Sequence, residues 1–348
     1  MSDGKYDLSV VILNYNGQQW IDRCFASLRA QTAAARMEVL VADNLSTDGS
    51  DLLIENKIRG WANWRFIQHG ANLGYCDGNN RAAKQARGKY LIFLNNDLWL
   101  EPDCLERLLE EMERTGAAAG NPLVLNYDDD SFQSLGATGF DCFGLTTARI
   151  QFKETREVLM PEGCAYLIRR QVFEDLGGFD PEIFMYADEY DLSWRLWIAG
   201  YSALGVPSAR LHHRGAANVN PRGGGKVVEM RTSDTKRFYA NRNALLVLLK
   251  NCRHLLLGMA ILQLGLYLAE AAASLILVRR WSFVRRAYLD AVKDCWRLRR
   301  HIVAERTRIS GLRKRGDIQM LRFLKLRMNR WDEVVRMITH GKPTVSEK

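Results

Sequence analysis

Paired cysteines, a leader segment and nucleic-acid-binding motifs are all missing from this chain of 348 residues. Its seven cysteines are scattered and odd in number, and no two of them form a Cys-x-x-Cys pair. This spacing argues against a disulfide or zinc framework and indicates thiols that pack as small apolar residues in a reducing compartment. The first seven residues are mostly polar and lead into an apolar run, so we expect no secretory leader and a cytoplasmic protein.

Positive charge is unevenly placed along the chain. The formal net charge is +9, and residues 279–348 hold 20 Lys and Arg against 7 Asp and Glu. This tail therefore carries more than the whole surplus. A basic segment can bind nucleic acid or anionic lipid. Because no zinc-finger spacing and no aromatic RNA-binding motif accompany it, we expect the protein to bind no nucleic acid.

The first hundred residues alternate between short apolar runs and segments with helical spacing. A turn of small polar residues, 46–50, separates the second strand from the helix that follows it. Strands alternating with helices predict a mostly parallel sheet that is covered by helices on both faces. We predict strands at 8–13, 37–42, 65–68, 90–94, 164–169 and 202–206, and helices at 20–28, 51–58, 102–115 and 188–199.

Polar side chains end three of the predicted strands. They are Asn14 and Asn16 after the first strand, Asp43 after the second, and Asn95, Asn96 and Asp97 after the fourth. Ligands of such sheets bind beyond the carboxyl ends of the strands, so these three ends together form a candidate site. A carboxylate such as that of Asp97 suits Mg²⁺ or Mn²⁺, which complete their shells with substrate phosphates.

An apolar segment at residues 255–278 interrupts this pattern. It has the length of a membrane span, but Glu270 near its middle would be costly in lipid. Basic residues flank it on both sides. Three interpretations remain open: a helical hairpin that packs on the domain or on a partner such as a second copy, a helix lying in the plane of a membrane, and a true span.

Four segments occur in a fixed order, namely "VVILNYNGQQWIDRCFASLRAQT", "EVLVADNLSTDGS", "GANLGYCDGNNRAAKQARGKYLIFLNNDLWLEP" and "GGFDPEIFMYADEYDLSWRLWIAGY". With them, residues 8–243 closely resemble the family 2 glycosyltransferases, particularly the bacterial rhamnosyltransferase-like branch. The resemblance implies an α/β fold of the A-type glycosyltransferase class, a Rossmann-like mostly parallel sheet with flanking helices, plus a helical C-terminal region. We expect a nucleotide-sugar-binding catalytic domain at 1–242 and a helical, basic region at 243–348.

The same resemblance assigns the nucleotide-sugar-binding residues. Asn14, Asn16 and Asp43 look like the nucleotide pocket, in which Asp43 would receive the base or the ribose. The loop that closes over the nucleotide and ribose is matched by Asn72, Gly74 and Asn79.

A divalent cation, Mn²⁺ or Mg²⁺, is also implied by the resemblance. Asn95, Asn96 and Asp97 stand where the family carries an Asp-x-Asp motif, so Asn95 replaces the first acid and Asp97 is the expected ligand. His213 matches the histidine that completes the metal shell in relatives, and Arg214 is expected to pair with diphosphate oxygens.

The catalytic acids of the family fall on Asp188, Glu189 and Asp191. The order Asp-Glu is reversed here, and Glu189 is the expected general base, which removes the proton of the acceptor hydroxyl. Asp188 and Asp191 remain alternatives, because these three side chains cannot all face one acceptor from a single helical turn. For Trp194 and Trp197, helical spacing favours core packing over sugar stacking.

The resemblance predicts metal-dependent, inverting, non-processive transfer of a sugar such as rhamnose from a dTDP donor to a surface-glycan or polyprenyl-diphosphate-linked acceptor. The Gln-x-x-Arg-Trp signature of processive synthases is missing. The basic tail suits work at an anionic membrane surface, on the inner face of the cell membrane, and residues 255–278 could equally form a homodimer interface. One alternative is a nucleotide-sugar- or glycan-binding protein without catalysis, supported by Asn95 and Glu189. Loops 125–150 and 221–225 are expected to set the donor and acceptor specificity.

Overall fold

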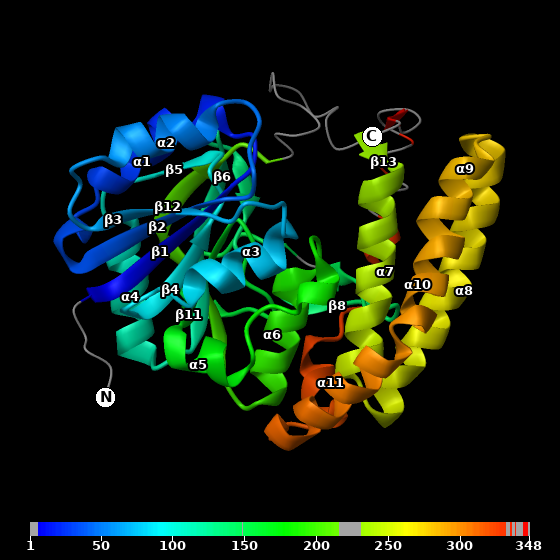
Figure 1. Cartoon of the computed structure of the whole chain (residues 1–348). Helices are drawn as coiled ribbons and strands as arrows, with labels where there is room; N and C mark the ends of the chain where they lie inside the picture. The colour runs from blue at the N-terminus through cyan, green and yellow to red at the C-terminus, as the bar shows by residue number, and fades with distance from the viewer. Residues whose placement is uncertain are drawn as a thin grey trace. The chain divides into compact units, whose positions relative to one another are not determined.

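The computed structural model describes residues 6–147, 149–215, 231–331, 335, 338 and 344–346. The chain divides into two compact units, of which the first holds the large sheet and the second holds most of the C-terminal helices (Figure 1). The first unit comprises Met1–Ala137, Arg149–Leu196 and Tyr201–Gly215, and the second comprises Thr138–Ala148, Trp197–Gly200 and Ala216–Lys348. The predicted loop at 221–225 lies outside the described residues.

One half of the large sheet is parallel. It contains β1 (Tyr6–Asn14), β2 (Met37–Asp43), β3 (Trp64–Gln68) and β4 (Gly88–Leu94), in the order β3-β2-β1-β4. The central strands are apolar on both faces, as buried parallel strands must be. The register pairs Asn14 with Asp43, so the polar ends of β1 and β2 lie side by side. The four strands predicted from the first hundred residues are confirmed.

The other half of the sheet is mixed. β11 (Ala165–Arg169) runs antiparallel between β4 and β6 (Ala119–Asn126), and β6 is parallel to β12 (Ala203–His213). Because β11 is antiparallel to both β4 and β6, β6 and β12 run parallel to β4, and β12 ends at the same sheet edge as β4. All strands of seven or more residues therefore share one direction. The shorter strands of the first unit are β5 (Leu98–Leu100), β7 (Phe132–Ser134) and β10 (Arg156–Glu157).

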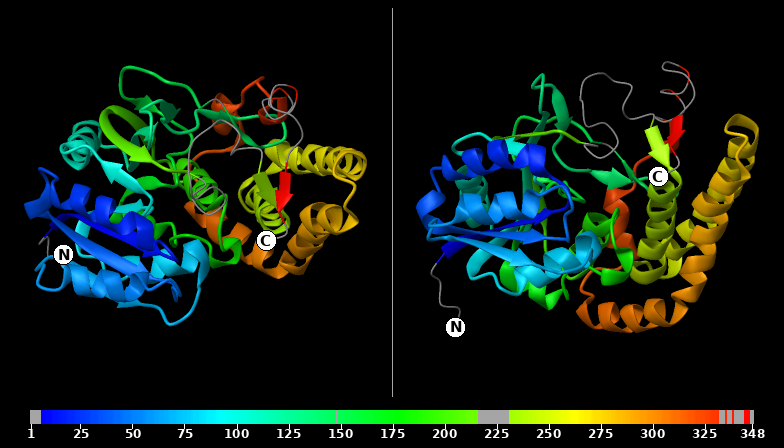
Figure 2. Two further views of the ribbon diagram at one scale, coloured as in Figure 1. Left: turned by 90° about the horizontal axis from the view of Figure 1, so that it is seen from above. Right: turned by 45° about the horizontal axis from the view of Figure 1, so that its top comes forward.

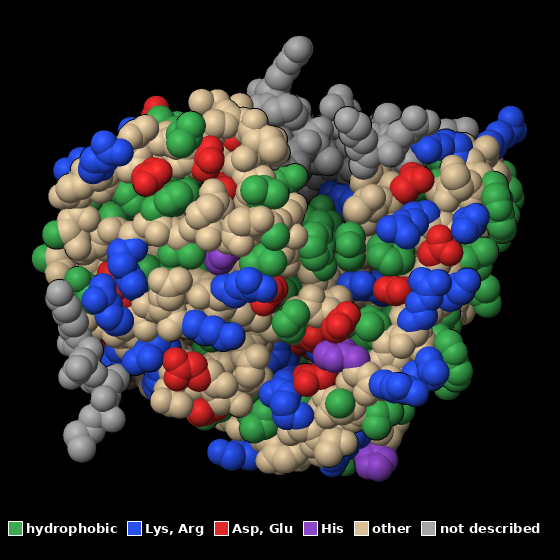
Figure 3. All heavy atoms as spheres, viewed as in Figure 1, with side chains coloured by type: hydrophobic (Ala, Val, Ile, Leu, Met, Phe, Trp, Pro, Cys, Tyr) green, Lys and Arg blue, Asp and Glu red, His purple; other side chains and the backbone are tan. Residues whose placement is uncertain are grey.

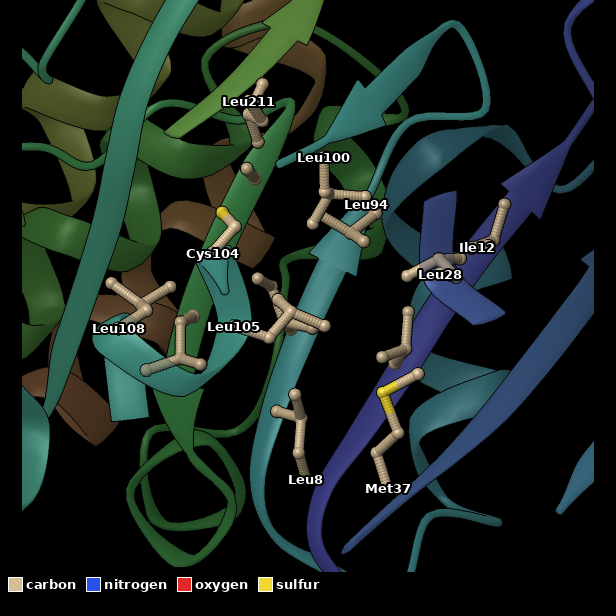
Figure 4. Close-up of a cluster of buried hydrophobic side chains, with 14 of the residues drawn as sticks. Leu8, Ile12, Leu28, Met37, Leu94, Leu100, Cys104, Leu105, Leu108 and Leu211 are labelled. Carbon is tan, nitrogen blue, oxygen red and sulfur yellow. The ribbon is translucent and has the colours of Figure 1, made fainter. Parts of the chain in front are cut away.

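Helices cover both faces of the sheet (Figures 1 and 2). On one face, α1 (Gln18–Arg29), α2 (Ser50–Ile58) and α4 (Cys104–Thr115) form one apolar cluster with alternate residues of β1, β2 and β4 (Figure 4). The buried residues of α1 recur every three or four positions, as an amphipathic helix requires. The other face carries α3 (Gly74–Ala83) and α5 (Arg170–Asp175), and the short helices η1 (Ala34–Arg36) and η2 (Pro181–Ile183) lie in connections.

A strained loop precedes α6 (Asp188–Ile198). Phe184, Tyr186 and Ala187 adopt left-handed φ angles of 63°, 65° and 62°. Such angles cost non-glycine residues about 1–3 kcal/mol each, so the surroundings must hold them in place. Within α6, Trp194 and Trp197 are fully buried, which confirms core packing for both.

The second unit is mainly helical. α7 (Asp234–Asn251) and α8 (His254–Leu277) form a hairpin, and a continuous arm follows from α9 (Trp281–Val284) through the π-helix η4 (Arg285–Asp290) to α10 (Ala291–Arg297) (Figure 2). Ser233 accepts a hydrogen bond from the Lys236 amide and so caps α7. The remaining elements are α11 (Arg299–Leu312), α12 (Asp317–Met320), η5 (Leu321–Phe323), and the short strands β8 (Gly139–Phe140), β9 (Thr146–Thr147), β13 (Arg231–Ser233) and β14 (Thr344–Ser346).

Candidate active site

The buried amide of Asn14 joins three strand ends. Its Nδ2 lies 2.8 Å from Asp43 Oδ1, 3.0 Å from Ser46 Oγ and 2.8 Å from Ser50 Oγ. Its Oδ1 accepts a hydrogen bond of 2.7 Å from Asn96 Nδ2. The side chain is thus fully engaged with protein groups, and it sets the positions of Asp43 and Asn96. Contact of Asn14 with a nucleotide stays a prediction.

The turn after β2 completes the polar rim. Asn16 adopts a φ of 53°, is exposed, and accepts a hydrogen bond of 2.8 Å at Oδ1 from the Thr47 amide. Asp43 is buried and accepts from the amide and hydroxyl of Ser46. Burial opposes ionisation of Asp48, but hydrogen bonds from Ser50 and the Gln18 amide lower the pKa of this carboxyl. The sequence identified residues 46–50 only as a turn, and their part in fixing Asp43 was missed.

The loop before α3 brings Asn72 and Gly74 to the same edge. Asn72 is exposed and accepts a hydrogen bond of 3.1 Å from the Gly74 amide. Gly74 has a φ of +73°, and a Cβ there would lie 2.4 Å from the ring of Phe184, so only glycine fits. Asn79 is buried and donates to the Tyr75 carbonyl at 2.9 Å. Asn79 therefore stabilises the helix locally, and its predicted nucleotide contact remains untested.

Asp97 and His213 meet at the carboxyl edge from different strands. Asp97 Oδ1 lies 3.3 Å from His213 Nε2, and Asn95 Nδ2 lies 3.3 Å from the same nitrogen. His213 Nδ1 lies 2.9 Å from Gln133 Oε1. Because Gln133 accepts the Nδ1 proton, Nε2 presents its lone pair toward Asp97 whenever the ring is neutral.

The charges of this pair reinforce each other. Burial alone disfavours a charged imidazole, but Cys164 and Asp97 beside it raise the pKa of His213 well above its usual value. Burial likewise opposes ionisation of Asp97, yet His213 and the Asn95 amide lower the pKa of the carboxyl. In the absence of another cation, a proton on His213 thus holds the two groups together.

These two donors fit a divalent cation. One carboxylate oxygen and one imidazole nitrogen, oriented by Gln133, are ligands that Mn²⁺ and Mg²⁺ accept. Among the described residues, no group of three or more His, Cys, Asp or Glu could hold a metal ion. Oxygens of a bound diphosphate would suit the remaining positions of the shell.

The backbone of Arg214 lies next to the pair of Asp97 and His213. Its amide donates to the Asp97 carbonyl at 2.9 Å, while its guanidinium pairs with Asp128 at 2.6 Å. The side chain is therefore engaged with a carboxylate of the protein. The predicted pairing with a diphosphate would require an exchange of Asp128 for phosphate oxygens, and it stays a prediction.

The acids at the start of α6 differ in environment. Asp188 is buried, and burial together with the neighbouring charge of Glu189 raises the pKa of Asp188 well above its usual value. Burial also raises the pKa of Glu189, and Glu162 adds to this shift. The pKa values of both carboxyls are thus raised, and the two side chains share a hydrogen bond.

Asp191 instead forms a buried ion pair with Arg195. Its Oδ2 lies 2.8 Å from Nη2 and 2.9 Å from Nε of Arg195, and both side chains are at most 1% exposed. Arg195 also donates to the Leu176 carbonyl at 2.7 Å. A carboxylate held in a buried ion pair is not free to receive a proton from an acceptor. This placement favours Glu189 over Asp191 as the base.

Glu162 and Arg149 influence the charge of Glu189, and the sequence did not predict either contact. The Glu162 carboxylate accepts hydrogen bonds of 2.5 Å from Ser134 and 2.9 Å from Arg149. Tyr75 donates at 3.0 Å to the Gly163 carbonyl, and a Cβ on Gly163 would lie 3.3 Å from Glu189. The segment "PEGC" offered no periodic or motif signal for these contacts, which all join residues distant in sequence.

Comparisons with known proteins agree with this arrangement. A sequence profile described as "Glycosyl transferase family 2" matches residues 9–177. An N-acetylglucosaminyl-diphospho-decaprenol L-rhamnosyltransferase from Mycobacterium tuberculosis is 31% identical over 237 residues, which cover 60% of this chain and 76% of that protein. The mannosyltransferase PcManGT from Pyrobaculum calidifontis, in complex with GDP-Man and Mn²⁺, has a TM-score of 0.53 at 18% identity and covers 84% of this chain and 88% of its own.

A second solved structure shares the fold. GalNAc-T7 with UDP, GalNAc and Mn²⁺ gives a TM-score of 0.57 at 19% identity over 71% of this chain and 48% of that one. At these identities the two structures show the A-type glycosyltransferase fold. The expected fold class, an α/β sheet domain plus a helical C-terminal region, is therefore confirmed.

Proposed function

Because the chain belongs to the family 2 glycosyltransferases, we propose that it transfers one sugar from a nucleotide-diphospho-sugar to an acceptor hydroxyl, with inversion and with the help of a divalent cation. The observation that carries the proposal is the pairing of Asp97 Oδ1 with His213 Nε2, 3.3 Å apart at the carboxyl edge of the sheet. Both side chains belong to strand ends that the fold brings together from positions more than a hundred residues apart.

On this proposal the donor lies along the polar rim of the same edge. Asp43, fixed by Asn14 and Ser46, receives the base or the ribose, and Asn16 and Asn72 are exposed beside it. The diphosphate reaches Asp97 and His213, which hold the cation. When bound, Mn²⁺ or Mg²⁺ supplies positive charge for the diphosphate as it departs.

Glu189 is the proposed general base. It removes the proton of the acceptor hydroxyl as that oxygen forms its bond to the anomeric carbon, on the face opposite the departing diphosphate, which accounts for inversion. A raised pKa suits this role, because a carboxylate with greater proton affinity is a stronger base at neutral pH. Asp188 keeps its own proton and orients Glu189 through their hydrogen bond.

Two features of a relative support the finer assignment. The protein from Mycobacterium tuberculosis is an L-rhamnosyltransferase that acts on N-acetylglucosaminyl-diphospho-decaprenol, by its name. We therefore propose dTDP-rhamnose as the donor and a lipid-linked saccharide on a polyprenyl diphosphate as the acceptor. Such an acceptor places the reaction at the inner face of the cell membrane.

A donor screen tests the proposal. The full chain is incubated with dTDP-, UDP- and GDP-sugars, with Mn²⁺, with Mg²⁺ or with a chelator, and the released nucleoside diphosphate is measured. We expect release that depends on the metal and is fastest with dTDP-rhamnose. Metal-independent release would refute the role of Asp97 and His213. Binding of a donor without release, with any acceptor offered, would instead support the non-catalytic alternative.

A further inference from the structure

Half of helix α8 faces away from the rest of the second unit, and this half is apolar. Ile261, Leu268 and Ile276 are 73%, 71% and 72% exposed. We call the exposed residues of this helix the α8 face, and none of them is Asp, Glu, Lys or Arg. They are His254, Leu255, Ile261, Leu262, Gly265, Leu268, Ala269, Ala272, Ala273, Leu275, Ile276 and Leu277.

Apart from His254 at its first position, the strongly polar residues of α8 point inward. Tyr267 donates to the Asn241 carbonyl at 2.7 Å, and Glu270 pairs with Arg330 at 2.6 Å. Gln263 is fully buried. The helix therefore has its polar side in the protein and its apolar side outside, the reverse of a helix on a water-facing surface. Contiguous apolar surfaces of this kind mark contact with a membrane or a partner.

The position of α8 among its neighbours argues against a span. By length and composition, α8 could cross a membrane, and it is the one helix in the described part of the chain that passes this test. It packs along α7 and η4, however. These carry Lys236, Arg237 and Lys250 on α7 and Arg285 and Arg286 on η4. A span would draw such charges into the hydrocarbon with α8, at high cost.

The arm that follows α8 is strongly basic and carries two exposed tryptophans. Residues 279–300 contain eight Lys and Arg against two Asp. Trp281 and Trp296 are 57% and 70% exposed. Figure 3 shows hydrophobic side chains along the edge where Figure 1 places α8, with Lys and Arg side chains over the adjacent arm. Tryptophan prefers the interface between headgroups and acyl chains, and cations bind anionic headgroups.

We propose that the second unit binds the surface of an anionic phospholipid bilayer in the plane of the membrane. The α8 face enters the boundary between headgroups and acyl chains, and the exposed cations of residues 279–300 contact lipid phosphates. The charge of the arm selects this occupant over a second copy of the chain, because two copies would bring like charges together. This inference goes beyond the proposed function, since it needs neither the donor nor the residues at the sheet edge.

Vesicle binding tests the inference. The full chain is sedimented with vesicles of phosphatidylcholine alone and of phosphatidylcholine mixed with phosphatidylglycerol. We expect binding to the anionic vesicles and little to the neutral ones. The double variant Ile261→Glu with Leu268→Glu should lower the partition coefficient about tenfold or more, because two carboxylates must then enter the boundary layer.

Matched variants separate this effect from general damage. Leu52→Glu makes the same change at an apolar side chain of α2 that is 63% exposed, and it should leave vesicle binding unchanged. Replacing Arg297, Arg299 and Arg300 with Gln should reduce the preference for anionic over neutral vesicles. Circular dichroism and metal-dependent release of nucleoside diphosphate check that both units remain folded in every variant.

Two results would overturn the inference. One is that the wild type sediments equally with both kinds of vesicle and that the α8 variant sediments to the same extent as the wild type. The other is a dimer in analytical ultracentrifugation that the α8 variant dissociates, with no vesicle binding by the wild type, because a second copy would then cover the α8 face. Neither result bears on sugar transfer, which the donor screen measures independently.

Discussion

The two units of this protein depart from the usual distribution of side chains in opposite directions. In the first unit, polar side chains such as Asn14, Asp43 and Asp97 are buried and paired, Asn14 with Asp43 and Asp97 with His213. In the second unit, apolar side chains such as Ile261 and Leu268 are exposed. Burial of a polar group costs free energy unless it is paired, and exposure of apolar surface forgoes the hydrophobic gain. Each departure therefore marks a surface that serves something other than stability.

Within the first unit, acidic side chains serve two purposes. Glu189 and Asp97 face the candidate site, whereas Asp191 is sealed in an ion pair with Arg195. Removing the first kind should reduce activity and spare stability. Removing the second kind should do the reverse.

Glu189→Gln should lower kcat for sugar transfer about 10²–10⁴-fold, the usual contribution of a positioned general base. The amide keeps the shape of the side chain, so KM for the donor and the thermal unfolding midpoint should stay nearly unchanged. Steady-state kinetics and calorimetry measure these quantities. Glu182→Gln, at an exposed acid before α6, is the matched control. Full activity of the Glu189 variant would move the base to Asp188.

Asp97→Ala should lower metal-dependent turnover about 10²–10³-fold, since the charge on the departing diphosphate loses its counter-ion. Isothermal titration with Mn²⁺ in the presence of the nucleoside diphosphate should show weaker binding of the metal. Asp7→Ala, at the opposite end of β1, removes an exposed acid and serves as the control. An Asp97 variant that binds Mn²⁺ normally would exclude this residue as the ligand.

Asp191→Asn should destabilise the protein by about 3–5 kcal/mol, because it leaves the buried guanidinium of Arg195 without its counter-charge. Urea denaturation followed by circular dichroism measures the change. The exposed pair of Asp22 with Lys57 provides the control, and Asp22→Asn should cost no more than about 1 kcal/mol. Equal small effects of both variants would show that Asp191 has no special structural role.

The affinity for Mn²⁺ should rise with pH above 6.5. The pKa of His213 is raised well above that value, so the pair of its imidazolium with Asp97 is fully present below 6.5 and is lost as the pH rises through the raised pKa. A metal must displace this proton, so the apparent affinity should change about tenfold per pH unit until the raised pKa is passed. Mn²⁺ titrations across this range measure the slope, and His213→Gln should abolish it.

Gln263→Leu should raise the free energy of unfolding by about 1 kcal/mol. The side chain is fully buried in α8, and its Oε1 and Nε2 have no hydrogen-bond partner among the described residues. An unsatisfied buried amide carries a desolvation penalty that an apolar side chain of similar size avoids. Chemical denaturation tests this, with Gln19→Leu at an exposed position of α1 as the control. A loss of stability would show that Gln263 has a polar partner.

The sequence predicted the parallel half of the sheet well, because its strands are short apolar runs with abrupt polar ends. It missed β6, whose segment contains Gly120 and Pro122 and so lacks the pattern of a central strand. The structure accommodates Pro122 beside a register shift in β12 between Val206 and Arg210. It also places β11 between β4 and β6, an antiparallel insertion that periodicity along one strand cannot indicate.

The candidate site also contains residues that the sequence predicted and residues that only the structure reveals. Asp97, His213 and Glu189 were predicted from the resemblance to a family, and the structure brings the first two together. Glu162 and Arg149 were not found, because their contacts depend on how distant segments fold back on one another. The argument against Asp191 as the base also required the structure, since spacing on a helix does not tell which acid meets a buried Arg195.

The close approach of Gly74 to Phe184 would couple the binding of the two proposed substrates. The amide of Tyr75 donates to the Phe184 carbonyl at 2.7 Å, so the loop proposed to close on the donor is fastened to the strained segment that leads into Asp188 and Glu189. If donor binding changes the affinity for the acceptor by some factor through this link, acceptor binding must change the affinity for the donor by the same factor. An ordered reaction, in which the donor binds first, would then depend on the space that Gly74 leaves for the ring of Phe184.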